Sequence, residues 1–224
     1  MPSHKACIDD GCNPELVLGA KFNGIFEIPR IDAPDTIIRP DGFTPFTQRH
    51  RAPTGNEALS FFEFDVKFSD VLAHPERYIG AARSFALFVP PDCSVYRDMP
   101  LALQITNIYR SRAIGYYYQR HGANVYPLIR WGDERTYTDR VLSEPIAFAG
   151  VEMRSPVVVS TYGCIRGAEN RRHFKAGLEA MVDYLEPSLV LVHGPMPATV
   201  FSNVVGRSEF VRYPDWTTRM RGGR

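Results

Sequence analysis

The strongest constraint in the sequence is an alternation of short apolar runs and amphipathic segments between about residues 59 and 213. Apolar runs of strand length occur at 85–89, 157–160 and 189–192. Segments with helical periodicity separate these runs, and the clearest of them is residues 168–187. Strands that alternate with helices predict right-handed βαβ units around a parallel sheet.

At most about six strand–helix steps fit into this region. We therefore predict an α/β fold with a parallel sheet of about six strands. Two architectures fit: a reduced or incomplete TIM-like β/α barrel, and an open doubly wound sheet. Residues 1–58 are rich in proline and predict an irregular arm packed on the body, because proline removes backbone donors. Residues 214–224 form a basic tail, and residues 59–213 the catalytic-like domain.

Charge and topogenic signals narrow the function class. The chain has 26 basic and 25 acidic residues, a net charge of +1, which argues against coat proteins and polybasic membrane modules. No stretch approaches the roughly 18 apolar residues of a spanning helix. With four cysteines and no signal peptide, we expect a cytoplasmic protein with reduced thiols and no membrane partner.

Acidic residues follow three consecutive predicted strands, at the edge of the sheet where parallel α/β folds bind ligands. Asp65 follows the first, Asp92 the second, and Asp133 and Glu134 the third. Carboxylates that converge in a pocket can share a proton, activate a nucleophile or hold a metal. These four residues are the predicted catalytic groups. The alternative is that each acid caps the helix that follows it.

Other polar and aromatic residues near the strand ends predict substrate contacts. Trp131 and Tyr162 can stack a flat ring. The long helical segment that follows residue 98 repeats polar residues every three positions, which indicates a pocket lining, a buried polar network or a solvent face. The predicted substrate-binding residues are Ser94, Asn107, Arg110, Arg112, Arg130, Trp131, Tyr162 and His193.

The metal and thiol signals are weak. His4, Cys7 and Cys12 have the spacing of three soft ligands, but a structural zinc site needs a fourth, and we predict no cofactor. Cys93 and Cys164 both follow strands and are candidate nucleophiles, although buried inert thiols are commoner. P-loop, GxGxxG, HExxH and GxSxG motifs are missing from the sequence, which argues against the enzyme classes that use them.

The run at 90–137, PPDCSVYRDMPLALQITNIYRSRAIGYYYQRHGANVYPLIRWGDERTY, resembles the signature of an uncharacterised family of phages and plasmids. The family pattern is a strand closing in PDxS, then YRDMPLA, then NxYRxR, then a strand closing in WxDE. The resemblance covers roughly residues 59–200, and the segment with His4, Cys7 and Cys12 has no counterpart in it. It implies an α/β fold and a mobile-element context.

A weaker, fold-level similarity points to tRNA-guanine transglycosylase-like barrels, in which paired aspartates recognise the base and attack the sugar. By this analogy Asp92 and Asp133 act on the sugar and base, with Trp131 stacking the base. Those barrels are longer and have a zinc-binding cluster that this chain lacks.

Three functions follow as hypotheses. The first is an enzyme that acts on a nucleobase or nucleoside, by glycosyl transfer such as deazaguanine-type base exchange or by hydrolysis. The second is a non-catalytic protein that binds DNA or RNA through Arg97, Arg110, Arg112 and the C-terminal arginines. The third is a protein that binds a host factor.

Overall fold

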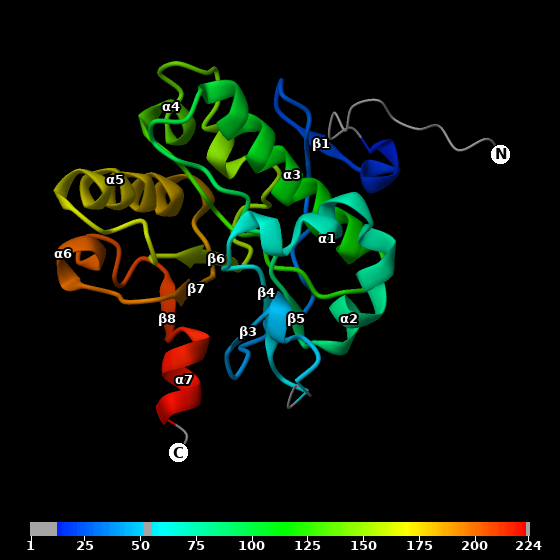
Figure 1. The fold of residues 1–224 in the computed structure, drawn as a ribbon. Coiled ribbons are helices and arrows are strands. Elements are labelled where there is room, and N and C mark those ends of the chain that lie inside the picture. The colour runs from blue at the N-terminus through cyan, green and yellow to red at the C-terminus, as the bar shows by residue number, and fades with distance from the viewer. Residues whose placement is uncertain (1–12, 52–54, 223–224) are drawn as a thin grey trace.

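The computed structural model describes residues 13–51 and 55–222, and Figure 1 shows an α/β protein with helices on both sides of short parallel strands. The strands are β1 (Phe22–Asn23), β2 (Ile28–Pro29), β3 (Phe43–Pro45), β4 (Ala58–Ser60), β5 (Leu87–Phe88), β6 (Val157–Ser160), β7 (Leu189–His193) and β8 (Glu209–Tyr213). The α-helices are α1 (Ser69–Ala73), α2 (Ile79–Ser84), α3 (Leu101–Arg120), α4 (Glu134–Tyr137), α5 (Ala168–Leu185), α6 (Ala198–Phe201) and α7 (Trp216–Gly222). Short 3₁₀ helices are η1 (Pro14–Val17), η2 (Phe46–Gln48), η3 (Asp65–Lys67), η4 (Pro75–Tyr78) and η5 (Ile146–Phe148).

The parallel strands form two three-stranded sheets, in the orders β3-β4-β5 and β6-β7-β8. The α/β class and the parallel pairing are as predicted. The prediction of one sheet of about six strands is not confirmed, and the described residues form no closed barrel. Figure 1 shows α5 and α6 beside the second sheet and α1 to α3 beside the first. All five residues of β7 are buried, as expected for a parallel strand covered on both faces.

Residues 124–129 connect the two sheets without forming a named strand. The sequence predicts a strand at 123–131, the third of the strands followed by acids, but the segment makes only two isolated parallel bridges, Phe88 to Val125 and Leu128 to Val158. Pro127 lies between these bridges and has no N–H to donate, so the ladder is interrupted there.

One buried cluster contains residues from both sheets and from the connecting segment. The ring of Phe43 in β3 lies 5.1 Å from that of Tyr213 in β8, although these two strands are not hydrogen-bonded to each other. The edges of the two sheets are therefore held together by side chains. Members of the cluster are Phe43, Ala58, Leu87, Val89, Tyr126, Leu128, Val158, Leu189, Leu191 and Tyr213.

The two terminal regions contribute more than the sequence indicates. Strand β3 lies inside the predicted arm and pairs with β4, so the arm supplies part of the first sheet. The predicted tail contains α7, and Figure 1 shows this helix extending from the end of β8 beside β3. Arg219 of α7 forms a largely buried ion pair with Glu57, with Nη2 2.5 Å from Oε1.

Arg112 of α3 lies in the core and not in a binding site. Its side chain is 1% exposed and donates hydrogen bonds to three carbonyl oxygens, those of Leu128 at 2.6 Å, Ala147 at 3.0 Å and Ala149 at 3.1 Å. Burial lowers the pKa of Arg112 to about 9. The guanidinium therefore binds the connecting segment and the η5 turn to α3.

We predict that Arg112→Met lowers the free energy of unfolding by about 2–4 kcal/mol, measured by urea denaturation. The methionine fills much of the volume but leaves three buried carbonyls without a donor, and each unsatisfied group costs about 1–3 kcal/mol. Relief of the buried charge offsets part of this loss. The control is Arg83→Met, an exposed arginine of α2, which we expect to change the stability by less than about 0.5 kcal/mol. Equal effects of the two variants would contradict the assignment.

Candidate functional site

A cavity of about 700 Å³ opens where the parallel strands end. Each strand of the two sheets, and the connecting segment 124–129, supplies at least one lining residue at or just after its carboxyl end. This is the edge at which the sequence predicts ligand binding. One lining residue from each, in chain order, is Thr47, Glu63, Asp92, Arg130, Tyr162, His193 and Asp215.

Asp92, Arg130 and Cys164 form a contiguous polar group in the wall of this cavity. Nε of Arg130 lies 2.8 Å from Oδ1 of Asp92, but the geometry is not that of a hydrogen bond, and neither atom has a hydrogen-bond partner among the described residues. Nη1 of Arg130 donates to Sγ of Cys164 at 2.7 Å. Burial raises the pKa of Asp92, opposed by the charge of Arg130 and reinforced by that of Asp65. Asp92 is thus a carboxylate of low solvation inside a cavity.

Asp65 holds the loop that follows β5. Its carboxylate accepts hydrogen bonds from the backbone N of Ser94 at 3.1 Å and from Oγ of Ser94 at 2.9 Å. On the other side, Nδ2 of Asn107 donates to the Ser94 carbonyl at 2.6 Å, and Arg110 contacts Asn107 at 3.3 Å. Of these four residues Ser94 lines the cavity, and the other three position it.

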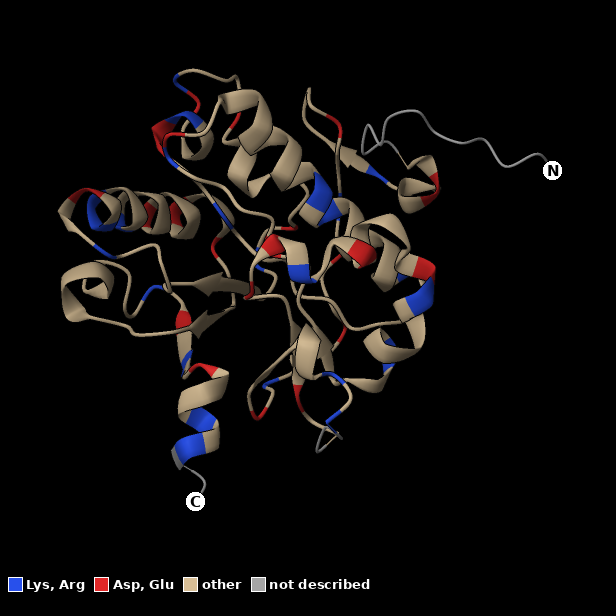
Figure 2. Cartoon of the chain, viewed as in Figure 1, with Lys and Arg blue, Asp and Glu red and all other residues tan. Residues whose placement is uncertain are grey.

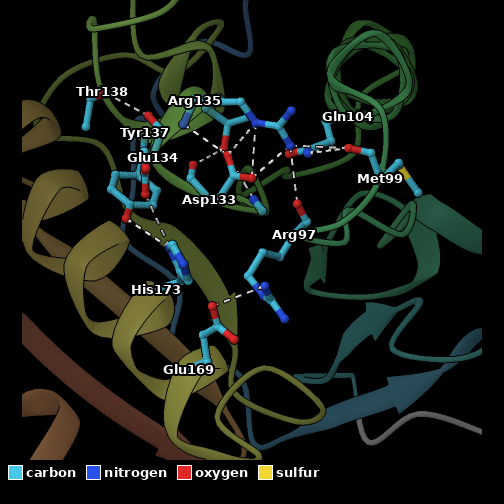
Figure 3. Close-up of polar contacts among 12 residues, drawn as sticks. Arg97, Met99, Gln104, Asp133, Glu134, Arg135, Tyr137, Thr138, Glu169 and His173 are labelled. Atoms are coloured by element: carbon cyan, nitrogen blue, oxygen red, sulfur yellow. Dashed lines mark hydrogen bonds and ion pairs between the residues drawn. The ribbon is translucent and has the colours of Figure 1, made fainter.

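Asp133 and Glu134 lie at the start of α4 (Figure 3). Oδ1 of Asp133 accepts a hydrogen bond from the backbone N of Arg135 at 3.0 Å, and its side chain forms an ion pair with the same arginine. Although burial opposes ionisation, these hydrogen bonds hold the pKa of Asp133 below its usual value. Glu134 is more than half exposed and lies 3.8 Å from the His173 ring. Asp133 is therefore a helix cap, the alternative that the sequence offered.

Trp131 lines the cavity but also belongs to the core. Its indole is 8% exposed, packs 5.1 Å from the Phe174 ring, and donates from Nε1 to the His173 carbonyl at 3.3 Å. A Cβ at Gly177 would lie 2.3 Å from Nε1, so this helix approaches the indole closely because it has a glycine there. Most of the ring surface is thus already covered.

His193 and Tyr162 lie together at the ends of β7 and β6. The His193 ring stacks on Phe62 at 4.1 Å, lies 4.9 Å from the Tyr162 ring, and places Nδ1 3.1 Å from Oγ of Ser160. Burial lowers the pKa of His193 to about 4, so the imidazole is neutral at physiological pH. The structure places both predicted residues in the cavity wall.

Sequence reasoning missed Asp215 and Trp216, which come from the predicted tail and line the cavity. Asp215 accepts hydrogen bonds from Tyr162 Oη at 2.8 Å and from the Thr218 backbone at 2.9 Å. Burial opposes ionisation, but these donors lower the pKa of Asp215 to about 2. The signal was available, because an aspartate after Pro214 and three residues before Thr218 is typical of a helix start.

The two cysteines in the described residues differ in their surroundings. Cys93 is buried, and burial raises its pKa to about 12, which makes it a poor nucleophile. Cys164 lines the cavity beside Arg130. Within residues 13–51 and 55–222 there is no group of three or more side chains suited to a metal ion. His4, Cys7 and Cys12 lie outside the described residues.

Comparison with known proteins identifies the family. The family model described as "Domain of unknown function (DUF4417)" matches residues 20–214. The chain belongs to this family. It is 30% identical over 192 residues to the Gene 1 protein of Mycobacterium phage D29, covering 82% of this chain and 67% of the relative. It is also 31% identical over 167 residues to the Gene 1 protein of Mycobacterium phage L5, covering 71% and 70% respectively. No solved structure matches the chain.

The DUF4417 match confirms the resemblance to a phage-associated family. It includes all of the cavity residues except those of the last helical segment, Asp215, Trp216 and Thr217. None of the helices in the described part of the chain is long and apolar enough to cross a membrane.

We predict that stability falls between about pH 6.5 and pH 4 because of His193. The unfolded chain binds a proton at this histidine near pH 6.5, whereas the folded protein resists protonation down to about pH 4. This difference in the pKa of His193 contributes roughly 3 kcal/mol to the free energy of unfolding. The contribution is fully present above pH 6.5 and is lost as the pH falls. Urea denaturation across this range measures it.

The test variant is His193→Gln, which cannot titrate, so its stability should depend less on pH in this window. The control is His74→Gln, at a partly exposed histidine of the surface, which should keep the wild-type slope. Parallel slopes for wild type and His193→Gln would contradict the prediction.

Proposed function

We propose that the protein is an enzyme that acts on a nucleobase or nucleoside, with Asp92 as the reacting carboxylate. The observation that supports this is that Asp92, although paired in charge with Arg130, accepts no hydrogen bond from the described residues. Of the three carboxylates that line the cavity, Glu63 accepts hydrogen bonds from Thr47, and Asp215 accepts them from Tyr162 and Thr218. Asp92 accepts none from any described residue.

A carboxylate in this state suits two routes at a glycosidic carbon. In transfer, an oxygen of Asp92 bonds to the sugar carbon while the bond to the base breaks, and the base leaves with the electron pair and takes a proton from solvent. A second base then bonds to the same carbon, loses a proton to solvent and displaces the carboxylate. In direct hydrolysis, Asp92 takes a proton from a water molecule whose oxygen bonds to the sugar carbon, while the bond to the base breaks and the base takes a proton from solvent. Arg130 lies 2.8 Å away in both cases, where it stabilises the carboxylate charge and sets its position. Glycosyl transfer is therefore the reaction class that we propose, with hydrolysis as its simpler form.

The aromatic lining favours a flat heterocycle as the ligand. Phe62, Tyr162 and Trp216 line the cavity, and His193 adds a neutral polar ring among them. Any nucleobase can stack on an aromatic ring of this kind, and each stacked base contributes about 1–3 kcal/mol to the binding free energy. Tyr162 takes the stacking role in this proposal, since the Trp131 ring is largely covered by the core.

The finer fold assignment is part of the same proposal. We propose that the two sheets and segment 124–129 form an incomplete β/α barrel. The two isolated bridges and the shared cluster from Phe43 to Tyr213 support it. In such folds the site lies at the carboxyl ends of the strands, where this cavity is found.

The test is base release and base exchange on a panel of ribo- and deoxyribonucleosides, measured by mass spectrometry with an isotope-labelled free base. We expect wild-type turnover and a loss of at least about a hundredfold in Asp92→Asn, because the amide neither attacks carbon nor takes a proton. The matched control is Asp98→Asn, an exposed residue of the same loop that does not cap α3. It should keep full activity.

Asp133→Ala tests whether Asp133 is a helix cap or a reacting carboxylate. As a cap, its loss should cost about 1 kcal/mol of stability and leave the activity per folded molecule unchanged. No base release from any nucleoside, or full activity in Asp92→Asn, would refute the proposal.

A further inference from the structure

We infer that the substrate is a single-stranded polynucleotide, with one base in the cavity and the strand lying across its mouth. The inference rests on the nucleobase chemistry proposed above. It adds a surface outside the reacting group, made of two exposed aromatic side chains that line the cavity and a basic segment, residues 161–175, that also contributes to the lining.

The first observation lies inside the cavity. His193 is 6% exposed, and its Nδ1 faces Ser160, but its Nε2 has no hydrogen-bond partner in the part of the chain that the structure describes. Because His193 lines the cavity, this nitrogen is available to form a hydrogen bond with a ligand there. The edge of a nucleobase has hydrogen-bond donors and acceptors, either of which can pair with Nε2 of His193.

The second observation is a pair of aromatic side chains exposed at the rim. Phe64 is 77% exposed and Tyr96 is 57% exposed, and both line the cavity. The Tyr96 hydroxyl donates to Oγ of Ser94 at 3.2 Å, which restrains the ring. Apolar rings of this size are normally buried, whereas exposed aromatic rings beside a basic surface are the platforms on which unpaired bases stack.

The third observation is charge. Residues 161–175 contain four basic residues and one acid, a net +3 in a chain whose total is +1. Glu169 is that acid, and it lies 3.3 Å from Arg97 across the mouth and 4.0 Å from Arg172. Arg166 and Arg171 form no ion pair with any residue in the described ranges. Figure 2 shows the basic residues in the first turns of α5, and Figure 3 shows Arg97 directed toward Glu169.

These three features together fit a strand better than a free nucleoside. A nucleoside has one base for the cavity and no use for the rim rings or the arginines. A single strand supplies a base inside, a neighbouring base for Phe64 or Tyr96, and phosphates for the basic segment. In a duplex the neighbouring bases are stacked and paired, so the rim rings have no base to bind.

The experiment measures fluorescence anisotropy of labelled single-stranded DNA, single-stranded RNA of the same sequence, and duplex DNA over a series of salt concentrations. We expect both single strands to bind more tightly than duplex DNA. The comparison of single-stranded DNA with single-stranded RNA then shows whether the preferred substrate contains deoxyribose or ribose. Arg166→Ala/Arg171→Ala should reduce the slope of log affinity against log salt by about 1.4, from two phosphate contacts at about 0.7 each. Phe64→Ala should weaken binding on the order of tenfold.

Matched controls change the same residue types elsewhere. Arg154→Ala/Arg207→Ala removes two arginines from the groove at the amino ends of β7 and β8. Leu103→Ala removes an exposed apolar side chain, 52% exposed, from α3. Both should bind like wild type. Losses in these controls equal to those in the test variants would overturn the inference, as would duplex binding as tight as single-strand binding.

Two results separate this inference from the proposed function. If wild type releases bases from free nucleosides but binds neither single strand at low salt, the inference fails and the proposed function stands. If single strands bind with the expected variant effects but no substrate loses a base, the proposed function fails and the binding surface stands.

Discussion

The buried guanidinium of Arg112 is the interaction on which the centre of the fold depends. Segment 124–129 makes only isolated bridges, so the strand ladder alone holds the two sheets together weakly. Arg112 adds a charge-assisted bond to the Leu128 carbonyl and two more to the η5 turn. Asp92 follows one sheet and Arg130 follows this segment, and their 2.8 Å contact requires that the two be held in register.

The aspartates near the strand ends differ in the donors that surround them and not in their chemistry. Asp65, Asp133 and Asp215 each accept backbone N–H groups and serve as loop or helix anchors. Asp92 lies beside a cation whose N–H is not aligned with it, and burial raises its pKa. Asp65, Asp133 and Asp215 already accept hydrogen bonds from the chain, so these carboxylates hold the neighbouring loops and helices in place. Asp92 accepts none, so its oxygens are available to a ligand.

Local pattern was enough to predict part of this arrangement. The stripe of α5, the buried run of β7 and the position of Asp92 after a strand follow from periodicity and chain order. The role of Arg112 does not, because its acceptors lie 16, 35 and 37 residues away, and the sequence predicts this side chain as a substrate contact. Helix α7 is a similar case: its anchor, Arg219 to Glu57, spans 162 residues, so the sequence of the tail gives no sign of it.

The net charge of the chain is a second property that does not predict the site. A total of +1 argues against a protein that coats nucleic acid, because such proteins carry a large field of one sign. At physiological ionic strength, however, charges are screened over about 8 Å, so a phosphate at the mouth responds to the residues beside it and not to the whole chain. The basic residues of 161–175 lie in the turns that also supply Asn170 and His173 to the cavity. Local charge at the site, which only the fold reveals, is therefore the quantity that decides which ligand approaches it.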